Sequence, residues 1–336
     1  MNGMAPDQTK PVFVTGGSGF VGREVIAALA AKGVPVRALV RSPKAAATVT
    51  GLGATPVQGD LSTVDAMRAG MQGAAAVVHA AAKVDIWGKL EDFERDTIEG
   101  TRNALRAAEQ AGVPRFIHVG TEAVLAGGGP IIQADETAPY PPRPNGPYPW
   151  SKGQAERDVI AANRPGFATI SVRPRFIWGR GDTSLLPELL KAMQSGAWAW
   201  FGGGHHLTST CHVRNVAEGI LLAIERGTGG EIYFLTDGEP VEFRDFLTRM
   251  AATQGVVAPA RHAPLWVAKA LAGGGEFVWS SFSLKGRPPL TYTAINLMFQ
   301  EVTLRDGKAR AQLGYTSHVS IAQGLAELQA DAKPGP

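Results

Sequence analysis

The sequence predicts an α/β protein: a Rossmann-type, doubly wound parallel sheet followed by a smaller, mostly helical C-terminal region. Short β-branched apolar runs alternate with amphipathic segments through the first half of the chain. A glycine-rich turn follows the first of these runs, and after residue 180 the pattern loosens into a mixture of Pro, Gly and Trp. Alternation of this kind is typical of buried parallel strands covered by helices on both faces.

The expected elements follow from periodicity and glycine stops. A buried strand at 12–15 leads into a helix at 20–31 that ends before Gly33. A longer helix at 92–110 ends before Gly112. Further strands are expected at 36–40, around Val57, and at 75–79, 116–119, 168–173 and 232–235, with further helices at 150–162 and 215–225.

These elements suggest a division of the chain. Residues 1–10 are polar and are expected to form a disordered leader. Residues 11–180 are expected to form the dinucleotide-binding domain, to which 211–236 returns, and 181–210 and 237–330 the substrate-binding region. Ligands of open α/β sheets bind at the carboxyl ends of the strands, so this region should pack there. The apolar segment 264–272 is too short to span a bilayer and is expected to be a core helix or a pocket lid.

Composition restricts the class of partner. The 336 residues carry 33 basic and 30 acidic side chains, for a formal net charge of +3, which gives no reason to expect a nucleic acid or a membrane surface. A single cysteine excludes an intrachain disulfide and fits a reducing compartment, so we expect a cytoplasmic location. No membrane span and no metal site are expected, and a homodimer is compatible with the sequence.

A dinucleotide site is predicted at the first glycine-rich turn. Gly16, Gly19 and Gly22 form a G-x-x-G-x-x-G loop between the first strand and the first helix. The missing side chains let a pyrophosphate approach the backbone, and the helix offers the N–H groups around Phe20 and Val21 together with its positive dipole end. The strand–turn–helix context is the one that this motif requires.

The other cofactor residues follow the next strands. No acid ends the second strand, where Arg41 stands instead, and an arginine there favours NADP over NAD, with NAD left open. Asp60 and Leu61 follow the third strand and are expected beside the adenine. Ala80 and Ala81 follow the fourth strand and are small enough for the cofactor to lie against the chain.

A catalytic group is predicted around Tyr148 and Lys152. Their spacing of four places both on one face of a helix, and a neighbouring ammonium favours the phenolate and can hold a ribose. Thr121 follows the fifth strand, and its hydroxyl can orient a substrate oxygen toward Tyr148. The group suits proton transfer to or from an alcohol oxygen.

Together these residues resemble the extended short-chain dehydrogenase/reductase superfamily, and most closely its 3β-hydroxysteroid dehydrogenase and dihydroflavonol reductase-like group. The resemblance implies a nicotinamide-dependent ketone reductase or alcohol dehydrogenase, with Pro174 against the cofactor and Trp87, Glu122 and Trp178 near the substrate. One departure is Thr97, which stands where this superfamily commonly has an asparagine. The motifs that carry the resemblance are the glycine loop, His79-Ala80-Ala81, Thr121 with Val124, Tyr148-x-x-x-Lys152, Arg173-Pro174, Trp178-Gly179 and Ala311-Gln312-Leu313-Gly314-Tyr315.

Other functions stay open at this point. The tryptophans after the sheet favour a bulky apolar ketone or alcohol of steroid, flavanone or long-chain type. A nucleotide-sugar epimerase is the second reading, although the acid at the second strand is missing. A sugar 4,6-dehydratase would need a second carboxylate where Ala123 stands. A dinucleotide-sensing protein without turnover is the third, but such proteins lose the Tyr–Lys pair that this chain keeps.

Overall fold

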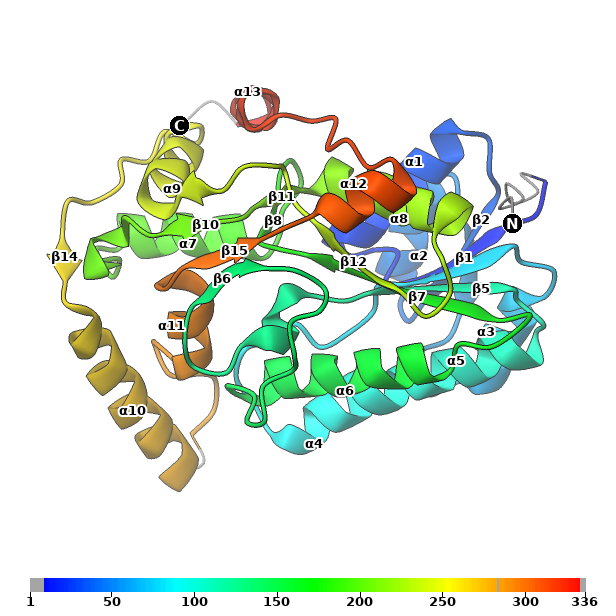
Figure 1. Cartoon of the computed structure of the whole chain (residues 1–336), viewed down its shortest axis with the longest axis horizontal. Helices are drawn as coiled ribbons and strands as arrows, with labels where there is room; N and C mark the ends of the chain where they lie inside the picture. Colours follow the sequence, from blue (N-terminus) through cyan, green and yellow to red (C-terminus); the bar gives the residue numbers. More distant parts are fainter. Residues whose placement is uncertain (1–8, 283, 333–336) are drawn as a thin grey trace.

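A seven-stranded parallel sheet forms the centre of the molecule (Figure 1). The computed structural model describes residues 9–282 and 284–332, so most of the predicted leader lies outside the described residues. The strand order is β12-β7-β5-β4-β1-β2-β3, and every neighbouring pair is parallel. This confirms the predicted fold class. The strands are β1 (Val12–Thr15), β2 (Val36–Val40), β3 (Thr55–Gln58), β4 (Ala76–His79), β5 (Arg115–Val119), β7 (Ala168–Pro174) and β12 (Ile232–Leu235).

Helices cover both faces of this sheet because its strands carry apolar side chains on both sides. Val12 and Val14 of β1 pack under α1 and α8, whereas Phe13 between them packs under α3 and α5 on the opposite face. Chain order reverses between β1 and β4, and the carboxyl ends of these two strands form the crevice where α/β sheets bind ligands. The covering helices are α1 (Phe20–Ala31), α2 (Pro43–Gly51), α3 (Val64–Met71), α5 (Gly100–Gln110), α6 (Pro147–Ala161) and α8 (Val213–Arg226).

The long helix expected at 92–110 is present but not uniform. It starts as α4 (Leu90–Phe93), passes through a π-helical stretch η1 (Glu94–Glu99) and continues as α5. A π-helical insertion inside an α-helix is uncommon and is frequent at functional sites. Hydrophobic periodicity alone does not reveal such an insertion.

The C-terminal region packs around an aromatic core of its own. Trp200, Phe243 and Phe246 are buried there with Phe176 and Trp178, and most of these rings meet edge to face. A four-stranded sheet of order β13-β10-β15-β6, which the sequence did not indicate, joins this region to the first domain. The elements are β6 (Ile131–Ala134), β8 (Ile177–Trp178), α7 (Leu185–Gln194), β9 (Trp200–Phe201), β10 (Leu207–Thr208), β11 (Cys211–His212), β13 (Val241–Glu242), α9 (Phe243–Ala252), β14 (His262–Ala263), α11 (Tyr292–Met298), β15 (Val302–Leu304), α12 (Gly307–Leu313) and α13 (Ile321–Asp331).

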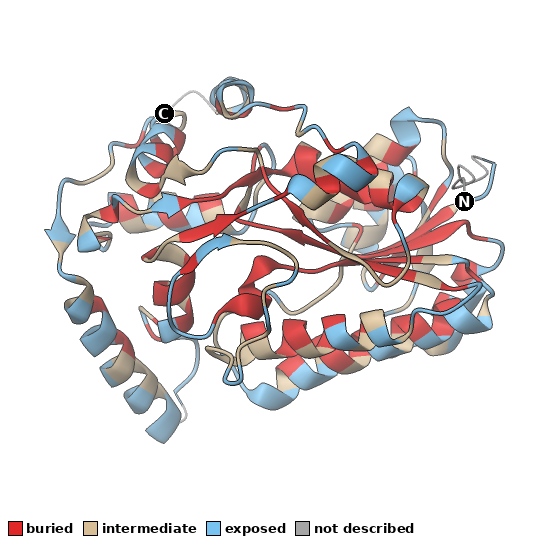
Figure 2. Ribbon diagram, viewed as in Figure 1, coloured by how far each residue is buried: buried red, intermediate tan, exposed pale blue. Residues whose placement is uncertain are grey.

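The segment 264–272, expected as a short core helix or a pocket lid, is helical, but the helix is longer than expected and is not a core helix. It forms α10 (Leu265–Ser281), which continues through three glycines. Its outer side is exposed over its whole length (Figure 2). Trp266 is 69% and Phe277 70% exposed, so much of its apolar surface faces away from the core. Within the described residues, no helix combines the length and hydrophobicity needed to cross a bilayer.

Candidate active site

The glycine loop between β1 and α1 brings the chain close to the end of β4. Gly16 has φ +70°, and a Cβ there would lie 2.8 Å from the backbone of Ala80 and Ala81. A Cβ on Gly22 would lie 2.2 Å from the carbonyl oxygen of Gly16. Gly19 is the N-cap of α1, and no side chain caps that helix end. The first N–H groups of α1, around Phe20 and Val21, therefore keep the geometry that a pyrophosphate needs.

The residues expected around the adenosine lie beside this loop. The Asp60 carboxylate accepts hydrogen bonds from the backbone and hydroxyl of Ser62, which lower its pKa. The guanidinium of Arg41 lowers it further, so the exposed Arg41 lies near Asp60. Leu61 packs against Gly100 of α5. Arg37, by contrast, donates to carbonyl groups at the end of α3.

The three predicted catalytic residues come from two elements at the carboxyl edge of β5. Thr121 directly follows this strand, accepts a hydrogen bond from the N–H of Ala123 (3.2 Å) and caps η2 (Glu122–Leu125). Tyr148 lies in the first turn of α6, and Lys152 lies one turn later. The Lys152 Nζ donates to the Val119 carbonyl oxygen at 2.8 Å, which fixes the ammonium at the end of β5.

Burial controls how Tyr148 and Lys152 titrate. Desolvation raises the pKa of Tyr148 to about 12, the Glu122 carboxylate adds to this, and the neighbouring Thr121 hydroxyl opposes it. Desolvation lowers the pKa of Lys152 to about 8, with Glu156 opposing. Lys152 is not among the groups that shift the pKa of Tyr148, so the effect of its ammonium on the phenol stays a prediction. Because its own pKa is about 12, Tyr148 remains a phenol across the physiological range.

Glu122 was predicted to face the substrate, but it is held in a buried ion pair. Its carboxylate accepts from the Thr121 hydroxyl (2.8 Å) and from Arg175 (3.0 Å). Glu122 is 3% and Arg175 4% exposed. The guanidinium also donates to the Leu297 carbonyl oxygen of α11 (2.5 Å). The Glu122 carboxylate thus acts on Thr121 and on the pKa of Tyr148, and its place near the substrate stays a prediction.

Trp178 was also predicted to face the substrate, and the structure places it in the core. It is fully buried and packs against His212 and Phe246. Its indole N–H donates to the Asp237 carboxylate at 2.7 Å. Trp178 ends the short strand β8, and the sequence did not show that Asp237 would accept the hydrogen bond of its indole.

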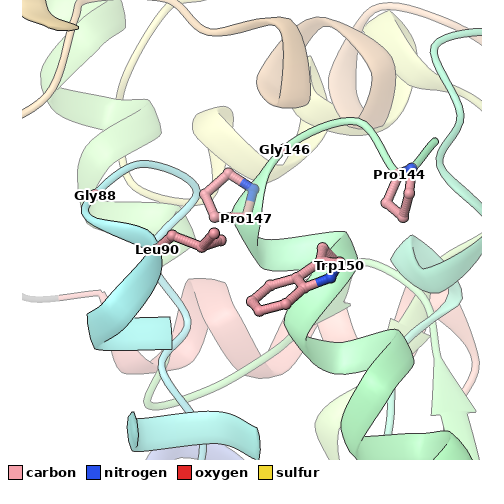
Figure 3. Close-up of a pocket in the computed structure, with 6 residues that line it drawn as sticks. All are labelled: Gly88, Leu90, Pro144, Gly146, Pro147 and Trp150. Atoms are coloured by element: carbon pink, nitrogen blue, oxygen red, sulfur yellow. The ribbon is translucent and has the colours of Figure 1, made fainter. Parts of the chain in front are cut away.

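The other predicted contacts lie in more open positions. Trp87 is half-buried in the loop that leads from β4 to α4. The next residue, Gly88, lines a pocket of about 350 Å³ together with Leu90, Pro147 and Trp150, at the first turn of α6 (Figure 3). Pro174 is buried at the end of β7.

Behind the site runs a chain of buried hydrogen bonds that the sequence did not indicate. Thr15 Oγ1 lies 2.8 Å from His79 Nδ1, and His79 Nε2 lies 3.1 Å from Thr101 Oγ1. The Thr101 hydroxyl donates to the Thr97 carbonyl oxygen (2.7 Å). The His79 Nε2–H therefore donates to Thr101, while Nδ1 accepts from Thr15. Burial and the nearby Lys152 lower the pKa of His79 to about 3, so the ring is neutral.

The same chain gives Thr97 a role. Its hydroxyl accepts from the N–H of Lys83 at 3.2 Å and ties the loop after β4 to the π-helical stretch of the long helix. Thr15, at the other end of this hydrogen-bond series, holds the same loop, because its hydroxyl accepts from the N–H of Ala81 (3.3 Å). The residues of this hydrogen-bond series come from four elements, β1, β4, η1 and α5. A spacing pattern in the sequence therefore could not have linked all of them.

With the site assembled, the comparisons with known proteins identify the family. The model of the 3-beta hydroxysteroid dehydrogenase/isomerase family matches residues 13–265. The chain belongs to this family. The resemblance proposed from the motifs is thereby confirmed, and the protein is an NAD(P)-dependent oxidoreductase of the extended short-chain dehydrogenase/reductase type.

Several curated relatives match along nearly their whole length. A 4-hydroxy-2-methyl-3-oxo-4-farnesyl-3,4-dihydroquinoline-1-oxide ketoreductase of Stigmatella aurantiaca is 49% identical, over 94% of this chain and 95% of that protein. A decarboxylating sterol-4-alpha-carboxylate 3-dehydrogenase of Dictyostelium discoideum is 34% identical, over 95% of this chain and all of the relative.

Solved structures share the fold at lower identity. A dTDP-glucose 4,6-dehydratase of Streptomyces venezuelae, crystallised with NAD, is 24% identical, covers 95% of each chain and has a TM-score of 0.74. A UDP-glucose 4-epimerase of Thermotoga maritima is 20% identical, covers 96% of this chain and 98% of that one, and has a TM-score of 0.73. At these identities the likeness establishes the fold alone.

Proposed function

We propose that this family member exchanges a hydride between NADP(H) and the carbonyl or carbinol carbon of an apolar ketone or secondary alcohol. The observation that carries the proposal is the meeting of Thr121, Tyr148 and Lys152 at the carboxyl edge of β5, close to the crevice beside the glycine loop. Tyr148 packs there against Ala126 and Leu297, so the side of the phenol toward α11 is apolar.

The nicotinamide, when bound, would give or accept the hydride. In the direction of reduction Tyr148 would donate its phenolic proton to the ketone oxygen. With a pKa of about 12 the phenol carries this proton at neutral pH. Thr121 donates its hydroxyl hydrogen to Glu122 and would orient the ketone oxygen by turning that hydrogen toward it. Lys152 has donors left beside the one used on Val119, and these would hold the cofactor ribose.

Relatives and site together favour an apolar substrate. The names of three relatives at 31–49% identity refer to a farnesyl quinoline oxide, a sterol carboxylate and a 2-alkyl-3-oxoalkanoate, each a compound with a large hydrocarbon part. A nucleotide-sugar dehydratase needs a second carboxylate, and Ala123 stands in that place. The one carboxylate present, Glu122, is bound to Arg175.

A panel of substrates tests the reaction class. The purified protein is mixed with NADPH and either long-chain, steroid and flavanone ketones or UDP- and dTDP-hexoses. We expect cofactor oxidation with one or more of the hydrophobic ketones and no conversion of the sugar nucleotides. Epimerised sugar nucleotide together with inert ketones would establish the alternative. Cofactor binding without turnover on either panel would indicate a sensing protein.

Cofactor choice is tested at Arg41, whose exposed guanidinium stands where an acid would exclude a 2′-phosphate. Arg41→Ala should weaken NADP(H) by about tenfold to a hundredfold, because a hydrogen bond to a charged group contributes about 1.5–3 kcal/mol. NAD(H) affinity should hardly change, which makes it the control. An unchanged ratio of the two affinities in calorimetric titrations would contradict the preference.

A further inference from the structure

Four polar side chains form a row across the sheet, beneath helices α5 and α6. Thr15 of β1, His79 of β4, His118 of β5 and Ser171 of β7 are direct neighbours in the strand register. They are all buried and point to the same face as Phe116, which packs under these helices. Polar groups buried in such a place need hydrogen-bond partners, because an unsatisfied one destabilises the fold.

The protein itself satisfies both sides of this row. His79 has Thr15 Oγ1 at 2.8 Å from Nδ1 and Thr101 Oγ1 at 3.1 Å from Nε2. At the other side, Ser171 donates its hydroxyl hydrogen to the Glu156 carboxylate of α6 (2.6 Å). Strand β5, with His118, lies between these two groups of hydrogen bonds.

His118 has no such partner. Its ring stacks on that of His79 with the centroids 5.7 Å apart, and it is 1% exposed. Neither ring nitrogen has a hydrogen-bond partner among the residues that the structure describes. Burial, with the charges of Lys152 and His79, holds the pKa of His118 well below its usual value, so the ring is neutral. A neutral imidazole still carries one N–H donor and one acceptor nitrogen, and both are enclosed here.

The ammonium of Lys152 lies close to this ring. Lys152 and Glu156 are four residues apart on α6 and therefore share the side of the helix that faces the sheet. Lys152 Nζ donates to the carbonyl oxygen of Val119, the residue after His118. The Glu156 carboxylate also reaches β5, since a Cβ on Gly120 would lie 3.0 Å from it. The polar ends of both α6 side chains thus meet β5 beside His118.

We propose that buried water hydrates His118, and that the water on the ring nitrogen nearest to Lys152 accepts an N–H of its ammonium and fixes it in place. This water donates one hydrogen to the ring, and the Ser171 hydroxyl oxygen is a further acceptor within the row. Such a set suits a buried water, which makes about three hydrogen bonds. His118 is then a positioning residue that acts through Lys152.

The ammonium has three N–H groups, and the proposal gives each one an acceptor. The first is the Val119 carbonyl oxygen, the second is the water on His118 and the third is the cofactor ribose. The place of the ribose rests on the proposed function, whereas the water and its effect on Lys152 do not. The ionisable groups that act on this pair of residues are His79 of β4 and Glu156 of α6.

A measurement of the pKa of Lys152 in the full chain, without cofactor or substrate, tests the proposal. The Cε signal of ¹³C-labelled lysine follows protonation of the amine, and Lys152→Met identifies the signal. His118→Phe keeps an aromatic ring and removes both nitrogens. The pKa of Lys152 should then fall by about one unit or more, because the ammonium loses a hydrogen bond that stabilises it. His118→Gln keeps a polar group for the water and should leave this pKa within about half a unit of wild type.

Phe116→Leu is the control for packing, because it changes the same face of β5 two residues earlier and removes no polar atom. It should lower the free energy of unfolding and leave the pKa of Lys152 unchanged. A crystal structure of the wild type at high resolution should show water within hydrogen-bond distance of His118, and this result does not depend on the folding of any variant.

Three results would overturn the proposal. The first is a Lys152 pKa in His118→Phe equal to that of wild type, and the second is an equal fall in Phe116→Leu. The third is a crystal structure in which both ring nitrogens of His118 lack water. Absence of ketone turnover would change none of these readouts, so failure of the proposed reaction is recognised separately.

Discussion

Two buried arginine–glutamate pairs lie close together at the end of β7, and they stabilise different things. Arg173 pairs with Glu156 of α6, and the two side chains are 1% and 0% exposed. The Glu156 carboxylate also accepts from Ser171 (2.6 Å) and Tyr140 (2.7 Å). Burial lowers the pKa of Arg173, but Glu156 and Tyr140 more than offset this, so the net shift is upward. This pair stabilises the packing of α6 on the sheet.

Arg175 pairs with Glu122, and here the balance is different. Burial lowers the pKa of Arg175 more than Glu122 raises it. The Glu122 carboxylate accepts from Thr121 and raises the pKa of Tyr148. Both carboxylates face groups that titrate, because Glu156 raises the pKa of Lys152 and Glu122 raises the pKa of Tyr148. The comparison teaches that the pairs differ in what they hold: Arg173–Glu156 joins α6 to β7, whereas Arg175–Glu122 positions the Thr121 hydroxyl at the site.

The largest effect is expected from breaking the structural pair. Arg173→Met leaves Glu156 buried without its cation and should lower the free energy of unfolding by about 3–5 kcal/mol, measured by urea denaturation. The double variant Arg173→Met/Glu156→Leu should recover much of this loss, because no charge is then left uncompensated. In the double variant the pKa of Lys152 should fall further, because the Glu156 carboxylate that raises it is gone. If Arg173→Met unfolded with nearly the wild-type free energy, the Arg173–Glu156 pair would not be the one that stabilises the fold.

Glu122→Gln tests the second pair, Arg175–Glu122. The amide still accepts from Arg175 or Thr121, so the loss of stability should be smaller than for Arg173→Met. The pKa of Tyr148 should fall, because the carboxylate that raises it is gone. A spectrophotometric tyrosinate titration, with Tyr148→Phe as the blank, measures this. An unchanged or higher Tyr148 pKa would show that Glu122 does not act on the phenol.

Lys152 gives a smaller effect that depends on pH. Its pKa of about 8 predicts that kcat/KM for ketone reduction falls as pH rises through 8, where the ammonium is lost. The free energy of unfolding should instead rise as pH rises. The unfolded chain keeps this proton up to about pH 10.5 and the folded chain releases it near 8, so raising pH between these values favours folding. The fall in kcat/KM should have its midpoint at pH ~8. A kcat/KM that stays constant from about pH 7 to 9 would contradict the lowered pKa of Lys152.

The sequence predicted the sheet and the catalytic group for a common physical reason. Buried parallel strands and their helices repeat with periods that short windows reveal, and the glycine loop and the Tyr148–Lys152 spacing are local. These signals gave the fold class, the sheet strands and the helix that carries Tyr148, although that helix starts at Pro147 rather than 150.

What the sequence did not reveal depends on contacts between distant segments. The sequence places Glu122 near the substrate but does not show that Arg175 lies 3.0 Å from it. Trp178 looks like a pocket wall until Asp237 accepts its indole N–H. The apolar residues at 264–272 were expected in a core helix or a pocket lid. Hydrophobicity indicates that a side chain avoids water, but it does not show which surface the side chain packs against. The division into domains and the roles of the cofactor residues stay predictions.

The most direct test of the central claim is the behaviour of Tyr148→Phe. The variant keeps the ring that packs against Leu297 and loses only the phenolic hydroxyl, which carries the proton. We predict that it binds NADPH as wild type does and folds normally, while kcat with a hydrophobic ketone falls by about 10²–10⁴-fold, the usual contribution of a general acid. A rate within a few-fold of wild type would contradict the account and place the proton donor elsewhere.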